Sequence, residues 1–271
     1  MEFQQKKQES VTTNISNKER NAGRVEITFY TDPLCCWSWG FEPQWRRLQY
    51  EFQDRIVYRN VMSGLLPGWR NYNDPLYLVS RPMQMGYVWH EASLKSGMQI
   101  YDRIWVEDPP ASSYPACIAV KCAELQSQTA GIKYLRMARE AVMLYGKNIA
   151  KQDVLTTIAE TLAKSYPGIL DTERFLQDLT INDNGINAFR KDLDEVQSRN
   201  ISRFPTLIMR SANKPSIMLT GYRPYPALLD AIQQVAQTTA SLQKPASKEA
   251  YIKYWGNITQ REIEEAFSDV K

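Results

Sequence analysis

The 271-residue sequence predicts an α/β fold in which a helical block interrupts a small sheet. Three observations carry this prediction. A strand, a helix and a second strand follow one another near the N-terminus; a long stretch of helical periodicity comes next; a hairpin and a helix then close the order. We therefore expect β-α-β, a helical insert and β-β-α, followed by short helices at the C-terminus.

The composition is that of an ordinary globular protein, with 43% hydrophobic and 23% charged residues. A net charge of +3 is too small to favour nucleic acid, and no apolar run could cross a bilayer, so we expect neither a nucleic-acid nor a membrane partner. Four cysteines are too few for a disulfide scaffold, and one histidine leaves no metal-ligand set. Residues 1–23 are polar and lack the apolar core of a signal peptide, which predicts a disordered tail and a cytoplasmic protein.

The first strand is predicted at Val25–Tyr30, where apolar residues alternate with polar ones. Helical periodicity follows from about Trp39 to Phe52, and the β-branched, alternating segment Arg55–Met62 predicts the second strand. Strands joined through a helix in this way run parallel.

Helices dominate the middle of the chain. The stretch Ser63–Ser113 is broken by glycines and prolines, with short helices expected around Leu76–Ser80 and Trp89–Ser96. Beyond it, helical periodicity predicts helices at Ala116–Leu125, Ile132–Tyr145, Asp153–Lys164, Thr172–Leu179 and Ile186–Ser198.

The sheet is expected to resume at Phe204–Met209, a strand entered through Pro205. Ser216–Thr220 predicts the returning strand of a hairpin, and Pro224–Gln237 predicts the closing helix. Two helices should follow, Lys248–Trp255 and Gln260–Phe267; Thr259 and Glu262 have the spacing of a capping box for the second. The predicted domains are a sheet domain of residues 24–73 and 202–238, an inserted helical domain of residues 74–201, and a C-terminal helical extension of residues 246–271.

The loop after the first strand carries the candidate site. It reads Asp32-Pro33-Leu34-Cys35-Cys36-Trp37-Ser38-Trp39-Gly40. At a helix start, unsatisfied N–H groups and the helix dipole lower the pKa of a thiol, and the thiolate is the nucleophile. We therefore expect Cys35 to be reactive, with a pKa below the free value of about 8.5. The alternative is a remnant of an active site in a binding protein.

These features resemble the thioredoxin fold as elaborated in the DsbA-like family. Asp32-x-x-Cys35-x-Trp37 is similar to the Asp-x-x-Cys-Pro-Trp-Cys signature of its cytoplasmic FrnE-like branch, and the resemblance spans about Arg24 to Gln237. It implies a thiol–disulfide oxidoreductase or isomerase in which Cys35 attacks. It further implies that a cis Pro205, with the neighbouring Phe204 and Thr206 and with Trp37, binds the substrate beside Cys35.

Two departures from that family change the expected chemistry. Cys36 and Ser38 stand where members carry proline and cysteine. Ser38 can donate a hydrogen bond to a thiolate but cannot resolve a mixed disulfide, so resolution is expected from glutathione, another thiol protein or, less readily, Cys36 or Cys117. A Cys35–Cys36 disulfide would be strained. The expected partners are protein thiols or disulfides or a small thiol substrate, with no tightly bound cofactor, glutathione at most as co-substrate, and a homodimer left open.

Two other functions stay open. The segment Cys35–Glu42 is similar to the motif of kappa-class glutathione transferases, which with 2-hydroxychromene-2-carboxylate isomerases share this architecture; this implies a glutathione-dependent transferase or isomerase acting on small hydrophobic compounds. Gly221-Tyr222-Arg223, however, occupies the place of their glutathione-anchoring Ser-Asp. The third function is a non-enzymatic adaptor that presents a client to a protease, a role of some cytoplasmic relatives, with residues 248–267 as a docking piece.

Other residues with chemical potential have simpler interpretations. His90, the only histidine, has no evident role beside Cys35. Cys117 and Cys122 point about 140° apart on one helix and should be buried, with a smaller chance that Cys117 faces Cys35. The tryptophans are core residues or line a cleft beside Cys35, and Glu107-Asp108 is expected in a solvated loop.

Overall fold

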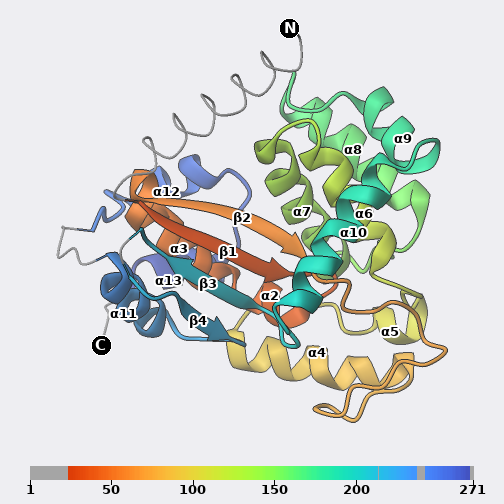
Figure 1. Cartoon of the computed structure of the whole chain (residues 1–271), viewed down its shortest axis with the longest axis horizontal. Coiled ribbons are helices and arrows are strands. Elements are labelled where there is room, and N and C mark those ends of the chain that lie inside the picture. Colours follow the sequence, from red (N-terminus) through yellow and green to blue (C-terminus); the bar gives the residue numbers. More distant parts are fainter. Residues whose placement is uncertain (1–23, 213, 237–241, 269–271) are drawn as a thin grey trace, which may run out of the picture.

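A four-stranded sheet lies at the centre of the computed structural model, which describes residues 24–212, 214–236 and 242–268 (Figure 1). The strand order is β2-β1-β3-β4; β1 and β2 are parallel, whereas β3 is antiparallel to both β1 and β4. The strands are β1 (Val25–Thr31), β2 (Ile56–Met62), β3 (Thr206–Arg210) and β4 (Ile217–Thr220). The predicted parallel pair and hairpin are confirmed. The expected tail, residues 1–23, lies outside the described residues.

Helices α3 and α11 cover one face of the sheet. The alternate residues Val25, Ile27 and Phe29 of β1 pack into one apolar cluster with side chains of α3 and α11. Tyr30, pointing to the opposite face, joins a smaller cluster with Val61. The alternating pattern of β1 therefore buries its apolar face fully, whereas Glu26 and Thr28 on the other face are only partly buried.

The helix expected at Trp39–Phe52 is two helices, α2 (Cys36–Gly40) and α3 (Glu42–Phe52), divided at Phe41. Pro43, in the first turn of α3, has no N–H with which to bond the Trp39 carbonyl, so the regular helical ladder is interrupted there. A short 3₁₀ turn, η1 (Gln53–Arg55), leads into β2. The division separates the cysteine-bearing turn from the helix that packs on the sheet.

The helical block has the predicted order, but the short helix expected at Trp89–Ser96 begins seven residues earlier, at Pro82, and the other helix ends are shifted by a few residues. It comprises α4 (Pro82–Ser96), α5 (Ile104–Glu107), α6 (Tyr114–Glu124), α7 (Gln128–Met143), α8 (Gln152–Ser165), α9 (Thr172–Thr180) and α10 (Asn184–Ser198). The four-residue α5 was not predicted. The helix expected at Leu76–Ser80 is wrong: a turn closed by an Asp74–Val79 bridge stands there, because the Asp74 carboxylate accepts the N–H groups of Leu76 and Tyr77.

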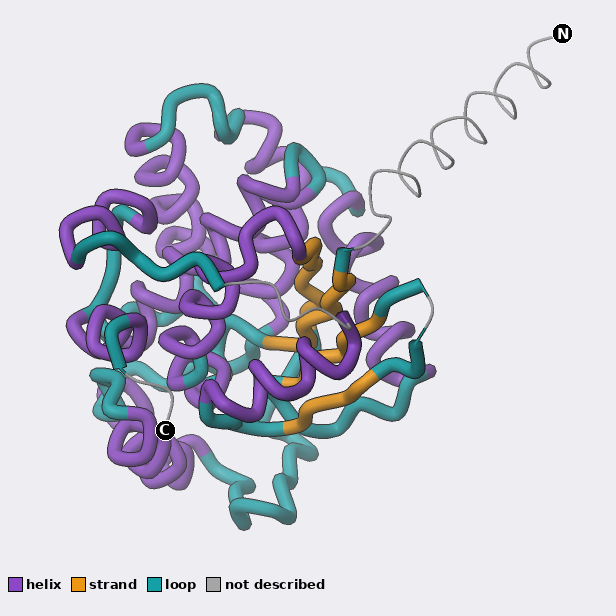
Figure 2. Tube along the Cα trace, turned by 90° about the vertical axis from the view of Figure 1, so that its left-hand side faces the viewer, coloured by secondary structure: helices purple, strands orange, loops and turns teal. Residues whose placement is uncertain are grey.

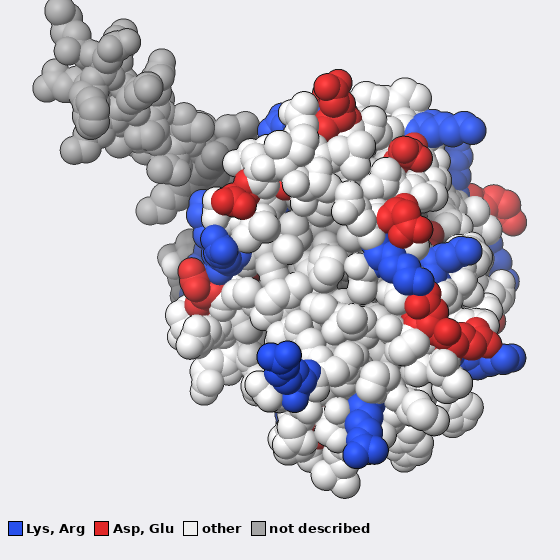
Figure 3. Space-filling model, turned by 90° about the vertical axis from the view of Figure 1, so that its right-hand side faces the viewer, with Lys and Arg blue, Asp and Glu red and all other residues white. Residues whose placement is uncertain are grey.

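Charge is spread over the surface. On the face shown in Figure 3, Lys/Arg and Asp/Glu side chains alternate over the upper part, and the lower part is largely uncharged; Figure 2 shows a loop projecting from this lower edge. In the described ranges, no helix is long and apolar enough to cross a bilayer, and no group of His, Cys, Asp and Glu could hold a metal ion.

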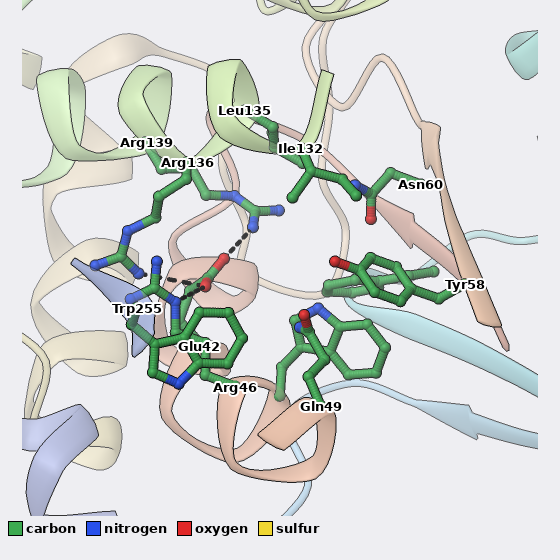
Figure 4. Close-up of a pocket in the computed structure, with 12 residues that line it drawn as sticks. Glu42, Arg46, Gln49, Tyr58, Asn60, Ile132, Leu135, Arg136, Arg139 and Trp255 are labelled. Atoms are coloured by element: carbon green, nitrogen blue, oxygen red, sulfur yellow. Dashed lines mark hydrogen bonds and ion pairs between the residues drawn. The ribbon is translucent and has the colours of Figure 1, made fainter. Parts of the chain in front are cut away.

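After α11 (Tyr225–Ala236), the C-terminal helices α12 (Lys248–Trp255) and α13 (Gln260–Ala266) pack against the chain itself. The predicted capping box of Thr259 and Glu262 is confirmed. Glu262 also reaches into a buried charged cluster, in which Figure 4 shows Glu42 between Arg136 and Arg139 with Arg46 nearby. The inner face of the C-terminal extension, α12 and α13, is therefore buried by contacts with the rest of the same chain. The division into domains stays a prediction.

Candidate functional site

Cys35 ends the loop after β1 and caps the start of α2, as the motif predicts. Its sulfur accepts the backbone N–H of Ser38 at 3.4 Å, and its thiol points at the Phe204 carbonyl, 3.8 Å away. The Phe204–Pro205 peptide is cis, as expected. Thr206 is buried at the start of β3. The structure thus places Phe204, the residue before Pro205, beside Cys35, although it follows Cys35 by 169 positions.

The expected low pKa of Cys35 is contradicted. Cys35 is only 3% exposed, and this burial raises the pKa of its thiol, with the Asp32 carboxylate adding to the effect. The Ser38 N–H favours the thiolate but does not compensate for this burial. Only the N–H makes a hydrogen bond; in the described residues the buried Ser38 hydroxyl has no partner. Desolvation of the thiolate therefore outweighs the helix start.

The other cysteines do not supply a second redox sulfur. All four are free and buried. Burial raises the pKa of Cys36 well above its usual value, and its thiol points at the Val88 carbonyl of α4, 4.0 Å away. Cys117 donates to Asp32 at 3.3 Å rather than facing Cys35, and Cys122 is buried as expected.

Asp32 connects the motif to the rest of the protein, a role that its place in the motif did not reveal. The carboxylate is fully buried. It accepts hydrogen bonds from the N–H groups of Leu34 (2.8 Å) and Leu65 (2.7 Å), the Ser113 hydroxyl (2.9 Å) and the Cys117 thiol (3.3 Å). Burial raises the pKa of Asp32, and these donors only partly oppose it.

Aromatic side chains from distant segments pack around the motif. Trp37, expected to contact substrate, stacks on Tyr77 with ring centroids 6.4 Å apart and meets Tyr222 at 6.2 Å. Tyr222 accepts a hydrogen bond from Gln44 at 2.8 Å, which fixes its ring. Burial raises the pKa of Tyr77 to about 12. No role was predicted for Tyr77, because it lies near no recognisable motif; Gly221-Tyr222-Arg223 was singled out in the sequence, but the packing of Tyr222 on Trp37 was not predicted.

The remaining candidates have partners elsewhere. His90 pairs with Asp102 at 3.3 Å on the surface. Glu107 accepts from Tyr101 at 2.6 Å, and Asp108 pairs with Lys151 at 2.7 Å. Trp89 and Trp105 are core residues that pack edge to face. The pocket in Figure 4 contains no residue of the Cys35 motif, and its guanidinium groups are paired with carboxylates, so we assign it no ligand.

Alkylation measures the state of Cys35 directly. We expect the rate of Cys35 modification by iodoacetamide, followed peptide by peptide in the mass spectrometer, to keep rising above about pH 9, since burial disfavours the thiolate. The urea-unfolded protein, measured in parallel, provides the rate of an accessible thiol. A native rate that levelled off near neutral pH would contradict the buried, protonated thiol.

Comparison with known proteins agrees with this fold. A family model described as thioredoxin matches residues 29–229. The ClpXP adapter protein SpxH of Halalkalibacterium halodurans is 28% identical over 252 residues, covering 92% of this chain and 80% of that protein. A putative protein disulfide isomerase from Nitrosomonas europaea superposes with a TM-score of 0.64 at 21% identity, over 80% of this chain and 100% of that chain.

A probable DsbA oxidoreductase from Streptomyces coelicolor superposes with a TM-score of 0.61 at 13% identity, over 82% of this chain and 94% of its own. At such identities the two solved structures bear on the fold alone, whereas the family model spans most of the sequence. The chain therefore belongs to the thioredoxin family, with a DsbA-like fold.

Proposed function

We propose that this protein is an adaptor that binds a client protein and delivers it to a ClpXP-type protease. Relatives that match most of the chain are named ClpXP adapter protein SpxH. The observation that carries the proposal in this chain is the state of Cys35, which is 3% exposed, has a raised pKa and has Ser38 in place of a resolving cysteine.

The motif is poorly suited to disulfide exchange for two physical reasons. Exchange begins with attack by a thiolate, and burial keeps the Cys35 thiol protonated. Turnover then needs a second sulfur, yet Cys36 and Cys117 point at the Val88 carbonyl and the Asp32 carboxylate. A thioredoxin fold whose cysteine is confined in this way retains its surfaces for binding other proteins, and an adaptor needs only these. No bound glutathione is required for this role.

The test has two stages. Quantitative proteomics of a strain lacking the gene should show that a few proteins accumulate. One of these, purified, is then incubated with ClpX, ClpP and ATP with and without this chain. We expect the chain to accelerate degradation about ten-fold or more, as adaptor binding raises the effective client concentration.

Cys35→Ala distinguishes the adaptor from the oxidoreductase. We expect the variant to deliver the client at a rate within about two-fold of the wild type, because delivery needs no thiol chemistry. Loss of delivery in the variant, or turnover of a protein disulfide by the wild type with glutathione as reductant, would replace the adaptor function with the oxidoreductase.

A further inference from the structure

One face of α4 exposes large apolar side chains. Met83, Tyr87 and Leu94 are 72%, 72% and 74% exposed, and their spacing of four and seven residues places them on one face of the helix. The opposite face, with Val88 and Trp89, is buried where α4 packs against α2 and α5. Folding therefore explains the inner face of α4 but not the apolar character of the outer one.

The turn before α4 extends this apolar surface. Leu76 and Leu78 are 53% and 77% exposed, whereas Tyr77 turns inward onto Trp37 and Val79 is buried. Paired backbone hydrogen bonds of 2.8 and 3.1 Å between Asp74 and Val79 close the turn. Along this turn, exposed and inward-pointing side chains alternate, so the hydrogen-bonded backbone directs Leu76 and Leu78 into solvent.

Leu78 has a left-handed backbone, with φ of 55°. This conformation is unfavourable for a residue with a branched side chain, and burial of the side chain does not offset its cost here. Strain that fixes an apolar side chain in solvent is consistent with a surface that binds something. We call Leu76, Leu78, Met83, Tyr87 and Leu94 the α4 surface.

Within residues 67–97, which carry the α4 surface, the exposed charged side chains are all positive. Of the charged side chains between residues 67 and 97, Arg70, Arg81 and Lys95 are exposed, whereas Asp74 and Glu91 are half-buried. Next to this segment, Glu107 of α5 forms an ion pair with Arg103, and the Asp102 carboxylate lies 3.3 Å from His90. Figure 1 shows α4 at the lower edge of the molecule, with the loop that precedes it projecting alongside.

We propose that the α4 surface is the client-docking site, and that it binds a client segment whose apolar residues alternate with Asp and Glu. The inference rests on the proposed adaptor function. Exposed leucines supply contact area, and the basic rim selects acidic neighbours. Monomeric proteins rarely expose such a patch unless it binds a partner. Because Tyr77 stacks on Trp37, a segment docked here lies beside the Cys35 motif.

A displayed peptide library tests the chemistry without knowledge of the client. Random peptides of about 16 residues, long enough to run along the whole of the 15-residue α4, are selected on the immobilised full-length protein. We expect the enriched peptides to combine Leu, Ile or Phe with Asp or Glu. Leu78→Ser/Leu94→Ser should weaken their binding about ten-fold or more, and Arg70→Glu/Lys95→Glu about five-fold.

Ile181→Ser is the matched control, because Ile181 is 80% exposed at the end of α9, outside the α4 surface. It should leave peptide binding unchanged, and near-UV circular dichroism should show that all variants fold. Enriched peptides that bind every variant equally, or that are basic, would overturn the proposal. So would a wild-type dimer that Leu78→Ser/Leu94→Ser dissociates in the ultracentrifuge, since the occupant would then be a second copy.

The degradation assay separates this inference from the function on which it rests. If the wild type delivers the client and Leu78→Ser/Leu94→Ser slows delivery about ten-fold, the docking site is supported. Undiminished delivery by that variant overturns the site and leaves the adaptor function intact. If the wild type does not deliver any client, the adaptor function fails and the client assignment fails with it, whatever the peptides show.

Discussion

Replacing Glu262 with glutamine should lower the free energy of unfolding by about 3–5 kcal/mol, because removal of one partner leaves buried charges uncompensated. Glu262 is fully buried on α13. Its carboxylate accepts two hydrogen bonds from Arg136, at 2.7 and 3.0 Å, and pairs with Arg46 at 3.3 Å. It also accepts the Thr259 N–H at 2.6 Å, which caps α13. Urea unfolding of the full chain measures the loss.

Glu264→Gln is the matched control for this prediction. Glu264 lies two residues along the same helix, is exposed and only accepts from Gln260. Its substitution should change the free energy of unfolding by less than about 0.5 kcal/mol. Equal effects of the two substitutions would show that α13 is not held by the charged cluster.

The pH dependence gives a second check on Glu262. Burial alone would raise the pKa of Glu262, but Arg46 and Arg136 outweigh it, so the pKa lies below its usual 4.5. A carboxyl whose folded pKa is depressed stabilises the protein above its unfolded pKa, and the contribution is lost as the pH falls through the folded value. The difference in stability between wild type and Glu262→Gln should therefore shrink as the pH falls below about 4.5.

The helices and strands could be predicted because each depends on residues that are close together in the sequence. The alternation of β1, the proline at the entry to β3 and the Thr259–Glu262 spacing each encode one element, and the structure has all of them. The second role of Glu262 has no such pattern, since its partner Arg136 lies 126 residues away. Asp74 likewise turned a predicted helix into a turn through side-chain hydrogen bonds that periodicity does not register.

The sequence predicted where the residues of the candidate site lie better than it predicted the pKa of Cys35. The placement of Cys35 at a helix start and its proximity to Phe204 follow from the motif and the family's strand order. Its raised pKa does not, because the sign depends on how completely the thiol is buried. Tyr77 and Tyr222, which lie far from the motif in the sequence, pack on Trp37 next to this buried thiol. A helix start predicts the direction of one contribution to the pKa, and desolvation decides the total.

Replacing Asp32 with asparagine should lower the free energy of unfolding by about 3 kcal/mol, because a buried donor left unsatisfied costs about 1–3 kcal/mol. One carboxylate oxygen accepts from Leu65, Ser113 and Cys117, and the other from Leu34. Asparagine has one acceptor oxygen and must point its NH₂ at donors on the other side. Asp183→Asn, at an exposed helix cap, is the matched control and should be nearly neutral.

Asp32 should show the opposite pH dependence from Glu262. Burial raises the pKa of Asp32 above its usual 3.8, so its ionisation is less favourable in the folded protein. A group with a raised folded pKa contributes stability that is complete below the unfolded pKa and is lost as the pH rises through the folded value. The difference in the free energy of unfolding between wild type and Asp32→Asn should therefore be largest near pH 4 and become smaller towards neutral pH.

The same substitution removes a negative charge that raises the pKa of Cys35, so alkylation of Cys35 at fixed pH should become faster. A stability difference that widened with pH would show that the folded pKa of Asp32 is depressed rather than raised. An unchanged alkylation rate would show that the Asp32 charge does not act on the Cys35 thiol.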